Sequence, residues 1–383
     1  MRFGLPSQFA ACLLLAVTTA VAAQNQQRQT AIALEQQGRN AEAEAAWRAY
    51  AAQRPSDPEP LAHIGLLEAR QDRYAEAIRS YRKALQLAPA MPGLRLNLGL
   101  AYFKSGQYRE VIETFAPLIR SEPNDERLNL LIGMSHYGLG QYAAANPYLK
   151  KAAADDSTNL TLQLTLAHSC LYSNQYPCVL DAFHRIVALN AQSAEAYMLM
   201  GEALDEMHET VEATKQFRAA AAANPKEPNV HFGLGYLLWK QAQYPEAAKE
   251  FQAELANVPD HLQAMRYLAN SYIEMGKYSE AEPLLKKAVA MDGSNEMAHR
   301  DLGILYAQTG KNDQALHELQ IAERLEPKDP TVHWRLGRLY RSMGKTAEAK
   351  AEMAQTMLLN KKADEGMVKA MQKAPPAKAP SPQ

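Results

Sequence analysis

The residues of this chain that suggest chemistry do not complete a catalytic motif. His208-Glu209 and His317-Glu318 each lack the second histidine, four residues on, with which a zinc protease holds its metal from one helix face. Gly344-Lys345-Thr346 matches the end of a phosphate-binding loop, but Leu339 stands where that loop needs its first glycine. We therefore predict that the chain is not an enzyme and that it holds no metal and no cofactor.

Composition indicates a folded protein without affinity for nucleic acid. The 383 residues are 47% apolar and carry a net charge of −1. A chain this apolar can form packed cores, and one this close to neutrality has no overall positive field to attract a phosphate backbone. We predict a partner other than nucleic acid.

Residues 1–23 have the pattern of a secretory signal peptide. Arg2 is their only charge, an apolar run follows from Phe9 to Val17, and small residues fill positions 20–23. Phe9 to Ala23 is shorter than the roughly 20 residues that a spanning helix needs. The pattern predicts an exported protein, periplasmic or extracellular, with a bacterial envelope preferred and cleavage near Ala22 or Ala23.

The rest of the chain repeats every 34 residues. Gly-x-Tyr turns begin at Gly106, Gly140 and Gly276, and their spacing defines ten windows without insertion or deletion. The windows start at residues 24, 58, 92, 126, 160, 194, 228, 262, 296 and 330. Position 8 is always Gly or Ala, position 20 is Ala or Val, and position 24 is large and apolar. This pattern predicts two helices per window that cross closely at the small residues and pack a large side chain beside the crossing.

These columns resemble the tetratricopeptide repeat family, and the match extends over residues 24–363. The family's tryptophan at position 4 is absent, and residues such as Leu61 and His333 stand there instead. The resemblance implies an all-α fold: a right-handed superhelical solenoid of helix–turn–helix repeats with a concave groove. Each repeat of a solenoid buries its apolar face against its neighbours. After the repeats we expect a short capping helix at 364–373 and a disordered Pro/Ala tail at 374–383.

Cys170 and Cys178 fall at positions 11 and 19 of the fifth window, on facing helices equally far from the turn. Two interpretations remain open. The pair forms a disulfide, which would contribute roughly 2 to 3 kcal/mol for so short a loop. Alternatively, Cys170 is a buried core thiol and Cys178 is an unrelated, more exposed one.

The resemblance also implies which residues line the groove, because positions 2, 5, 9, 12 and 13 face it in the family. The residues transferred in this way, together with their neighbour Arg335, are Leu96, Leu100, Phe103, Leu130, Met134, Tyr137, Leu164, Leu171, Phe232, Tyr236, Trp239, Arg266, Asn270, Trp334, Arg335, Arg338 and Arg341. The first eight form an apolar stretch that we expect to receive an extended or helical protein segment.

A clamp for a partner's terminal carboxylate, found in some members of the family, is only partly matched. Arg266, Asn270 and Arg335 fit it, but Asp301 replaces its second asparagine and would repel a carboxylate. Residues 330–383 carry ten Lys/Arg against four Asp/Glu, a net charge of +6. Acidic protein segments, or more weakly an anionic membrane surface, are therefore conceivable partners.

We predict a non-catalytic scaffold that binds proteins or peptides, with a role in envelope assembly, secretion or pilus biogenesis. Two alternatives stay open. One is a targeting subunit for a separate enzyme, such as a glycosyltransferase or protease, and the other is a binder of cell-wall glycan.

Overall fold

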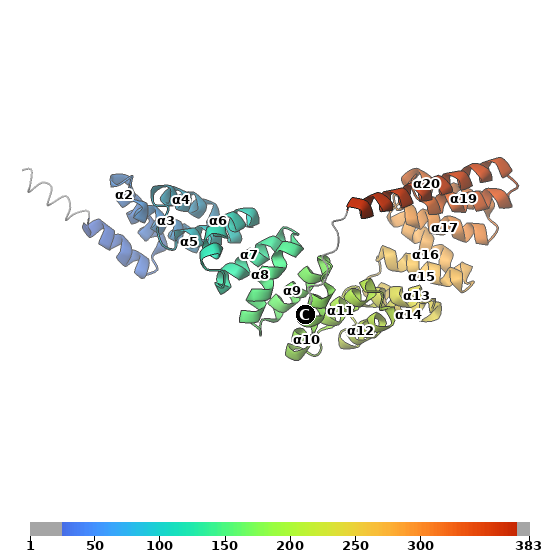
Figure 1. Cartoon of the computed structure of the whole chain (residues 1–383), viewed down its shortest axis with the longest axis horizontal. Helices are drawn as coiled ribbons and strands as arrows, with labels where there is room; N and C mark the ends of the chain where they lie inside the picture. The colour runs from blue at the N-terminus through green and yellow to red at the C-terminus, as the bar shows by residue number, and fades with distance from the viewer. Residues whose placement is uncertain (1–24, 374–383) are drawn as a thin grey trace, which may run out of the picture. The chain divides into compact units, whose positions relative to one another are not determined.

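A computed structural model describes residues 25–373, and within that range the chain forms helices joined by short turns, with no strand (Figure 1). The first helix spans residues 25–36. The others are α2 (Asn40–Gln53), α3 (Pro58–Arg70), α4 (Tyr74–Leu87), α5 (Leu94–Lys104), α6 (Tyr108–Ser121), α7 (Glu126–Gly138), α8 (Tyr142–Asp155), α9 (Leu160–Tyr172), α10 (Tyr176–Leu189), α11 (Ala194–Glu206), α12 (Thr210–Ala223), α13 (Val230–Lys240), α14 (Tyr244–Asn257), α15 (Leu262–Glu274), α16 (Tyr278–Met291), α17 (Glu296–Gln308), α18 (Asn312–Leu325), α19 (Pro330–Ser342) and α20 (Thr346–Lys373). The predicted all-α fold of tandem helical hairpins is confirmed.

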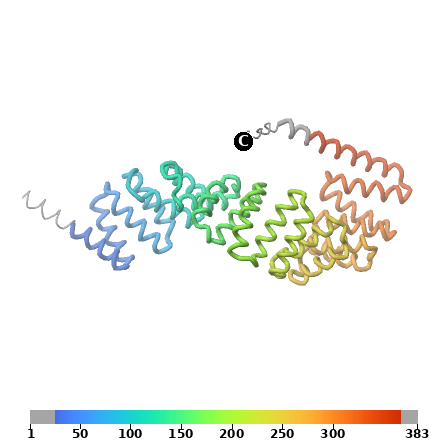
Figure 2. The backbone as a smooth tube through the Cα atoms, turned by 60° about the horizontal axis from the view of Figure 1, so that its bottom comes forward, coloured from blue at the N-terminus to red at the C-terminus, as the bar shows by residue number. Residues whose placement is uncertain are grey.

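The hairpins fall into two compact units, which we describe separately. Unit 1 extends to Leu189 and unit 2 begins at Asn190. Figure 2 follows the backbone through the successive hairpins of each unit. The predicted signal peptide and C-terminal tail lie outside the described residues. The segment expected as a separate capping helix, 364–373, is instead the end of α20, which runs without a break from Thr346 to Lys373.

Most first helices of the hairpins are capped by the last residue of the preceding window. That residue accepts a hydrogen bond from a backbone N–H of the first helical turn, which satisfies a donor that the helix itself cannot pair. The caps are Asp57, Asp125, Asn159, Ser193, His261, Asn295 and Asp329. In α13 the preceding Asn229 adopts a left-handed conformation (φ 65°) and makes no side-chain cap. Glu254 replaces it by accepting from the N–H of Phe232 at 3.1 Å.

The turn inside each hairpin needs a residue of positive φ at position 15. Glycine supplies it in six repeats, for example at Gly276 (φ 73°), because it has no Cβ to clash. Asp72, Asn174, His208 and Ala242 adopt the same conformation in the other four. Ala242, at φ 57°, has no polar side chain to offset the strain of this region.

The core of each repeat lies where its two helices cross. The position-20 residues are buried, and in the repeats with glycine at position 8 the large position-24 side chain packs directly on that glycine. A Cβ placed on Gly201 would lie 2.6 Å from the ring of Phe217, and one on Gly303 would lie 2.7 Å from Leu319. Glycine at these positions therefore allows a close approach that a larger residue would prevent.

Cys170 of α9 and Cys178 of α10 form a disulfide across the fifth hairpin, with their Cα atoms 5.8 Å apart. Both residues are buried, at 0% and 6% exposure. The structure agrees with the first of the two interpretations left open by the sequence, a disulfide, and Cys178 is buried.

Candidate functional site

The predicted groove residues of unit 1 all lie on first helices of hairpins, on α5, α7 and α9. Leu100 is exposed, whereas Leu96, Phe103, Leu130, Met134, Tyr137 and Leu164 are half-buried. Leu171 is only 7% exposed, so its expected place on the binding face is wrong. It is packed into the core of its repeat and offers a partner almost no surface.

A pocket of about 250 Å³ opens on this face between the second and third repeats. It is lined by Leu66, Ala69, Arg70, Tyr74, Tyr81, Asn97, Leu100, Ala101 and Lys104. In the repeat numbering these include positions 9, 12 and 13 of one repeat and 6, 9, 10 and 13 of the next. The pocket thus exists because two neighbouring hairpins leave a gap between their first helices, with cationic side chains at its rim.

Aromatic side chains at position 17 extend the same face and were missing from the predicted set. The ring of Tyr108 lies 5.8 Å from that of Phe103, and Tyr142 lies 5.5 Å from Tyr137 and 4.9 Å from Tyr172. The recurrent Gly-x-Tyr turn was the sequence signal for them. Its tyrosine begins the second helix, close to the end of the first, and so faces the same side.

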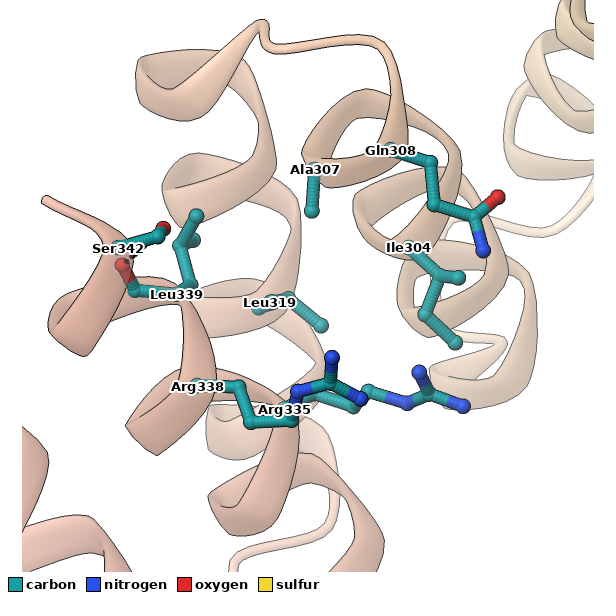
Figure 3. A pocket seen from close by; sticks show the side chains of 8 residues that line it. All are labelled: Ile304, Ala307, Gln308, Leu319, Arg335, Arg338, Leu339 and Ser342. Atoms are coloured by element: carbon teal, nitrogen blue, oxygen red, sulfur yellow. Dashed lines mark hydrogen bonds between the residues drawn. The ribbon is translucent and has the colours of Figure 1, made fainter.

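Unit 2 has a pocket of about 300 Å³ at the corresponding place between its last two repeats (Figure 3). Its lining comes from α17 through α19: Ile304, Ala307, Gln308, Leu319, Arg335, Arg338, Leu339 and Ser342. These residues occupy positions 9, 12, 13 and 24 of one repeat and positions 6, 9, 10 and 13 of the next. The same positions line the unit 1 pocket. Figure 3 shows the guanidinium groups of Arg335 and Arg338 extending along the same side of the pocket toward Ile304.

Arg335, one of the two arginines of this pocket, is poorly compensated by the rest of the protein. Burial, followed by the charges of Arg338 and Arg300, lowers the pKa of Arg335. The Nε atom of Arg335 is buried and has no acceptor within the described part of the chain. Both guanidinium groups lie 4.8 Å from the ring of Trp334, which is 37% exposed. An anionic side chain entering the pocket would gain from the two positive charges and from the unpaired Nε–H of Arg335.

The other predicted residues of unit 2 lie on α13, α15 and α19. Phe232, Tyr236 and Trp239 form a half-buried aromatic cluster around Tyr267, whose ring lies 6.0, 5.4 and 5.2 Å from theirs. Tyr267, at position 6, was not predicted. Asn270 is half-buried, and Arg341 is exposed at the end of α19.

Arg266 is not available to a ligand, and its prediction as a groove residue is wrong. It is 8% exposed, and its Nε and Nη2 donate to Oδ2 of Asp301 at 3.0 and 2.8 Å. The aspartate that replaces the clamp's asparagine therefore neutralises the clamp's cation. A carboxylate cannot be held there without breaking a buried ion pair.

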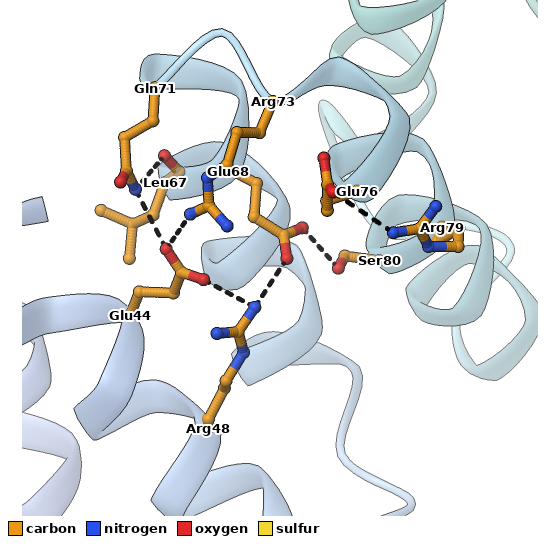
Figure 4. A network of polar contacts seen from close by, with 9 residues as sticks. All are labelled: Glu44, Arg48, Leu67, Glu68, Gln71, Arg73, Glu76, Arg79 and Ser80. Carbon is orange, nitrogen blue, oxygen red and sulfur yellow. Dashed lines mark hydrogen bonds and ion pairs between the residues drawn. The ribbon is translucent and has the colours of Figure 1, made fainter. Parts of the chain in front are cut away.

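Buried carboxylates in unit 1 are engaged in a similar way (Figure 4). Arg48 bridges Glu44 and Glu68 at 2.6 and 3.0 Å. Glu44 also accepts from Arg73 and Gln71. Burial favours the neutral form of Glu44, but these donors and the arginine charges prevail and lower its pKa. The network joins three helices rather than presenting a proton donor to a substrate.

Within the described residues, no helix combines the length and apolar character needed to cross a lipid bilayer.

Comparison with known proteins places the repeats in a family. Models described as tetratricopeptide repeat match residues 68–134 and 272–333, residues 28–92, 211–261 and 232–296, and residues 330–362. No protein of curated function matches the sequence.

Solved structures with a similar fold include YrrB, a TPR protein with an unusual peptide-binding site. The two share 18% identity over 46% of this chain and 92% of that one, with a TM-score of 0.40. The APC/C hetero-tetramer Cut9-Hcn1 matches 78% of this chain and 58% of its own at 15% identity and a TM-score of 0.48. MamA from Desulfovibrio magneticus RS-1 matches 45% of this chain and 97% of its own, at 21% identity and a TM-score of 0.41. With models of one repeat type matching residues 28–134 and 211–362, which together make up more than half of the sequence, the chain belongs to the tetratricopeptide repeat family.

Proposed function

We propose that this protein is a non-catalytic scaffold that binds extended protein segments along the first-helix faces of its repeats. The observation that carries the proposal is the recurrence of one pocket, built from the same repeat positions, in both units. A recurring pocket suits a ligand with side chains at intervals along a backbone.

The pocket linings favour segments that alternate apolar and acidic side chains. In unit 1, Leu66 and Leu100 lie beside Arg70 and Lys104, and in unit 2 Ile304 lies beside Arg335 and Arg338. Cationic groups at the rim of an apolar depression attract a carboxylate while the depression takes up its methylenes or a neighbouring apolar residue.

We further propose that the protein works outside the cytoplasm, in the assembly of the cell envelope, secretion or pilus biogenesis. The signal-peptide pattern of residues 1–23 and the disulfide of the fifth hairpin support this location, because disulfides persist in oxidising compartments.

The test is binding of synthetic 12-residue peptides, printed as an array that varies acidic and apolar content, to the purified chain. We expect peptides with both kinds of side chain to bind, and Arg338→Glu to weaken their binding at least tenfold. Lys350→Glu is the matched control, since it makes the same charge change on the exposed surface of α20 in the same unit. Equal losses in the two variants, or no preference for acidic peptides, would contradict the proposal.

A further inference from the structure

Three consecutive helices of unit 2 bring a histidine and two glutamates together at a point outside the pocket described above. The ligand atoms of His333 in α19, Glu352 in α20 and Glu323 in α18 all lie within 4.8 Å of one another. The Nδ1 atom of His333 is 2.7 Å from Oε2 of Glu352 and 3.9 Å from Oε1 of Glu323. The imidazole is buried, whereas the side chains of Glu323 and Glu352 keep 34% and 19% of their surface exposed, which leaves a solvent route to the cluster.

The other nitrogen of the ring fixes the form of the imidazole. Nε2 lies 3.0 Å from the carbonyl oxygen of Pro327, which only accepts hydrogen bonds. Nε2 therefore carries a proton. Nδ1 and Oε2 of Glu352 lie 2.7 Å apart and share a second proton in the metal-free protein, and release of that proton would leave the Nδ1 lone pair directed at a bound ion. A histidine that ligates a metal commonly donates its second N–H to a backbone carbonyl in the same way, because that bond orients the ring.

The carboxyl groups of Glu323 and Glu352 both approach the same imidazole, so two groups that carry like charge when ionised lie close together, which is unfavourable without a cation. A divalent ion between them would remove this repulsion and would use the oxygen ligands that lie on either side of Nδ1.

The rest of the chain supplies an internal comparison. His231 and His299 occupy the same repeat position as His333, and their Nδ1 atoms pair at 2.7 Å with Glu250 and Glu318, the equivalents of Glu352. The position of Glu323, however, is Ala221 near His231 and Val289 near His299. The histidine–glutamate pair is thus a general feature of this repeat, and the third ligand is added at the last repeat.

We propose that Glu323, His333 and Glu352 form a binding site for a divalent transition-metal ion, with Zn²⁺ as the expected occupant. One imidazole nitrogen and two carboxylate oxygens are a ligand set that Zn²⁺ accepts, and three protein ligands leave a coordination position for water. The sequence alone predicted no metal. The spacings of 10 and 19 residues match no metal-binding motif, and only the stacking of three helices brings the groups together.

The test uses the untagged full chain, with Zn²⁺ affinity measured by competition against a chromophoric chelator and Co²⁺ binding measured by visible absorption. Glu323→Gln is the informative variant because Glu323 lies beyond hydrogen-bonding distance of His333, so the substitution leaves the His333–Glu352 bond in place. We expect wild type to bind one more Zn²⁺ than this variant, or to bind its ion at least tenfold more tightly.

Two further variants separate ligation from a structural role. His299→Gln removes an equivalent histidine–glutamate pair without a third carboxylate, and we expect it to leave the Zn²⁺ stoichiometry and affinity unchanged. Val289→Glu supplies the missing carboxylate beside His299 and Glu318, and we expect it to add one bound ion. Equal Zn²⁺ binding by wild type and Glu323→Gln would overturn the proposal. Equal losses of Zn²⁺ binding in Glu323→Gln and His299→Gln would also overturn it. In either case His333 would be a protonated ring held by its two glutamates.

Discussion

The buried pair of Arg266 and Asp301 allows an unusually direct test of how unit 2 is held together. Its two members lie in different repeats, on α15 and α17, and are 8% and 4% exposed. Removing one partner of such a pair costs about 3 to 5 kcal/mol, because the other charge stays buried without compensation. Replacing both by apolar side chains of similar volume is often close to neutral.

The surroundings of the pair make the two single substitutions unequal. Asp301→Leu leaves the guanidinium of Arg266 buried without its carboxylate, so we expect a loss of about 3 to 5 kcal/mol in the free energy of unfolding. Arg266→Met leaves Asp301 with a second cation, because Nε of Arg300 is 3.8 Å from its Oδ1. We therefore expect a smaller loss, about 2 kcal/mol, and a double variant within about 1 kcal/mol of wild type.

The assay is urea unfolding of the full chain by far-UV circular dichroism, with hydrogen exchange of amides in α15 and α17 to locate the change in unit 2. The coupling energy follows from the double-mutant cycle. Additive losses in the double variant, or a larger loss for Arg266→Met than for Asp301→Leu, would refute the reasoning. They would show that Arg266 is stabilised by something other than Asp301.

Three other predictions concern the turns, the acid stability and the disulfide. Ala242→Gly should raise the free energy of unfolding in urea and Gly276→Ala should lower it, by about 0.5 to 1 kcal/mol each, since both residues occupy the same positive-φ position of successive repeats. A change in the same direction for both variants would contradict this. The pKa of Glu44 in the folded protein is lowered from 4.5, so its contribution to the free energy of unfolding is complete above pH 4.5 and is lost as the pH falls through the folded-state pKa. Glu44→Gln should therefore reduce the loss of stability at acid pH, measured as the free energy of unfolding against pH. Reduction of the bridge between Cys170 and Cys178 should destabilise the protein by about 2 to 3 kcal/mol, measured by unfolding with and without dithiothreitol; identical curves would show that the bridge does not constrain the unfolded chain.

The sequence predicted the repeat architecture well because each column has a local cause. The second helices begin every 34 residues, from Asn40 to Thr346, at the position that follows the turn. A further column was readable but overlooked: the last residue of most windows, as at Asp57 and Asn159, is one that caps helices. The end of α20 was predicted as a separate helix although no proline breaks the sequence between Thr346 and Lys373.

The binding face was harder to predict, because exposure depends on what lies across from a residue in the next repeat. Arg266 fits a groove position by its number alone. Its burial depends on Asp301, a neighbour 35 residues away that occupies position 6 of the next repeat. The charge of Asp301 was visible in the sequence, but its effect was assigned to a partner's carboxylate instead of to the arginine beside it.

The position of the helix caps has a consequence for how arrays of this kind can be shortened or lengthened. A residue such as Ser193 or Asn295 ends one window by sequence, yet its oxygen serves the helix that opens the next. A designed truncation that removes every residue before a window boundary would strip the first remaining helix of its capping residue. If the cut is made one residue earlier, each capping residue stays with the helix that it caps. The self-contained structural repeat is therefore offset by one residue from the 34-residue windows that the sequence pattern defines.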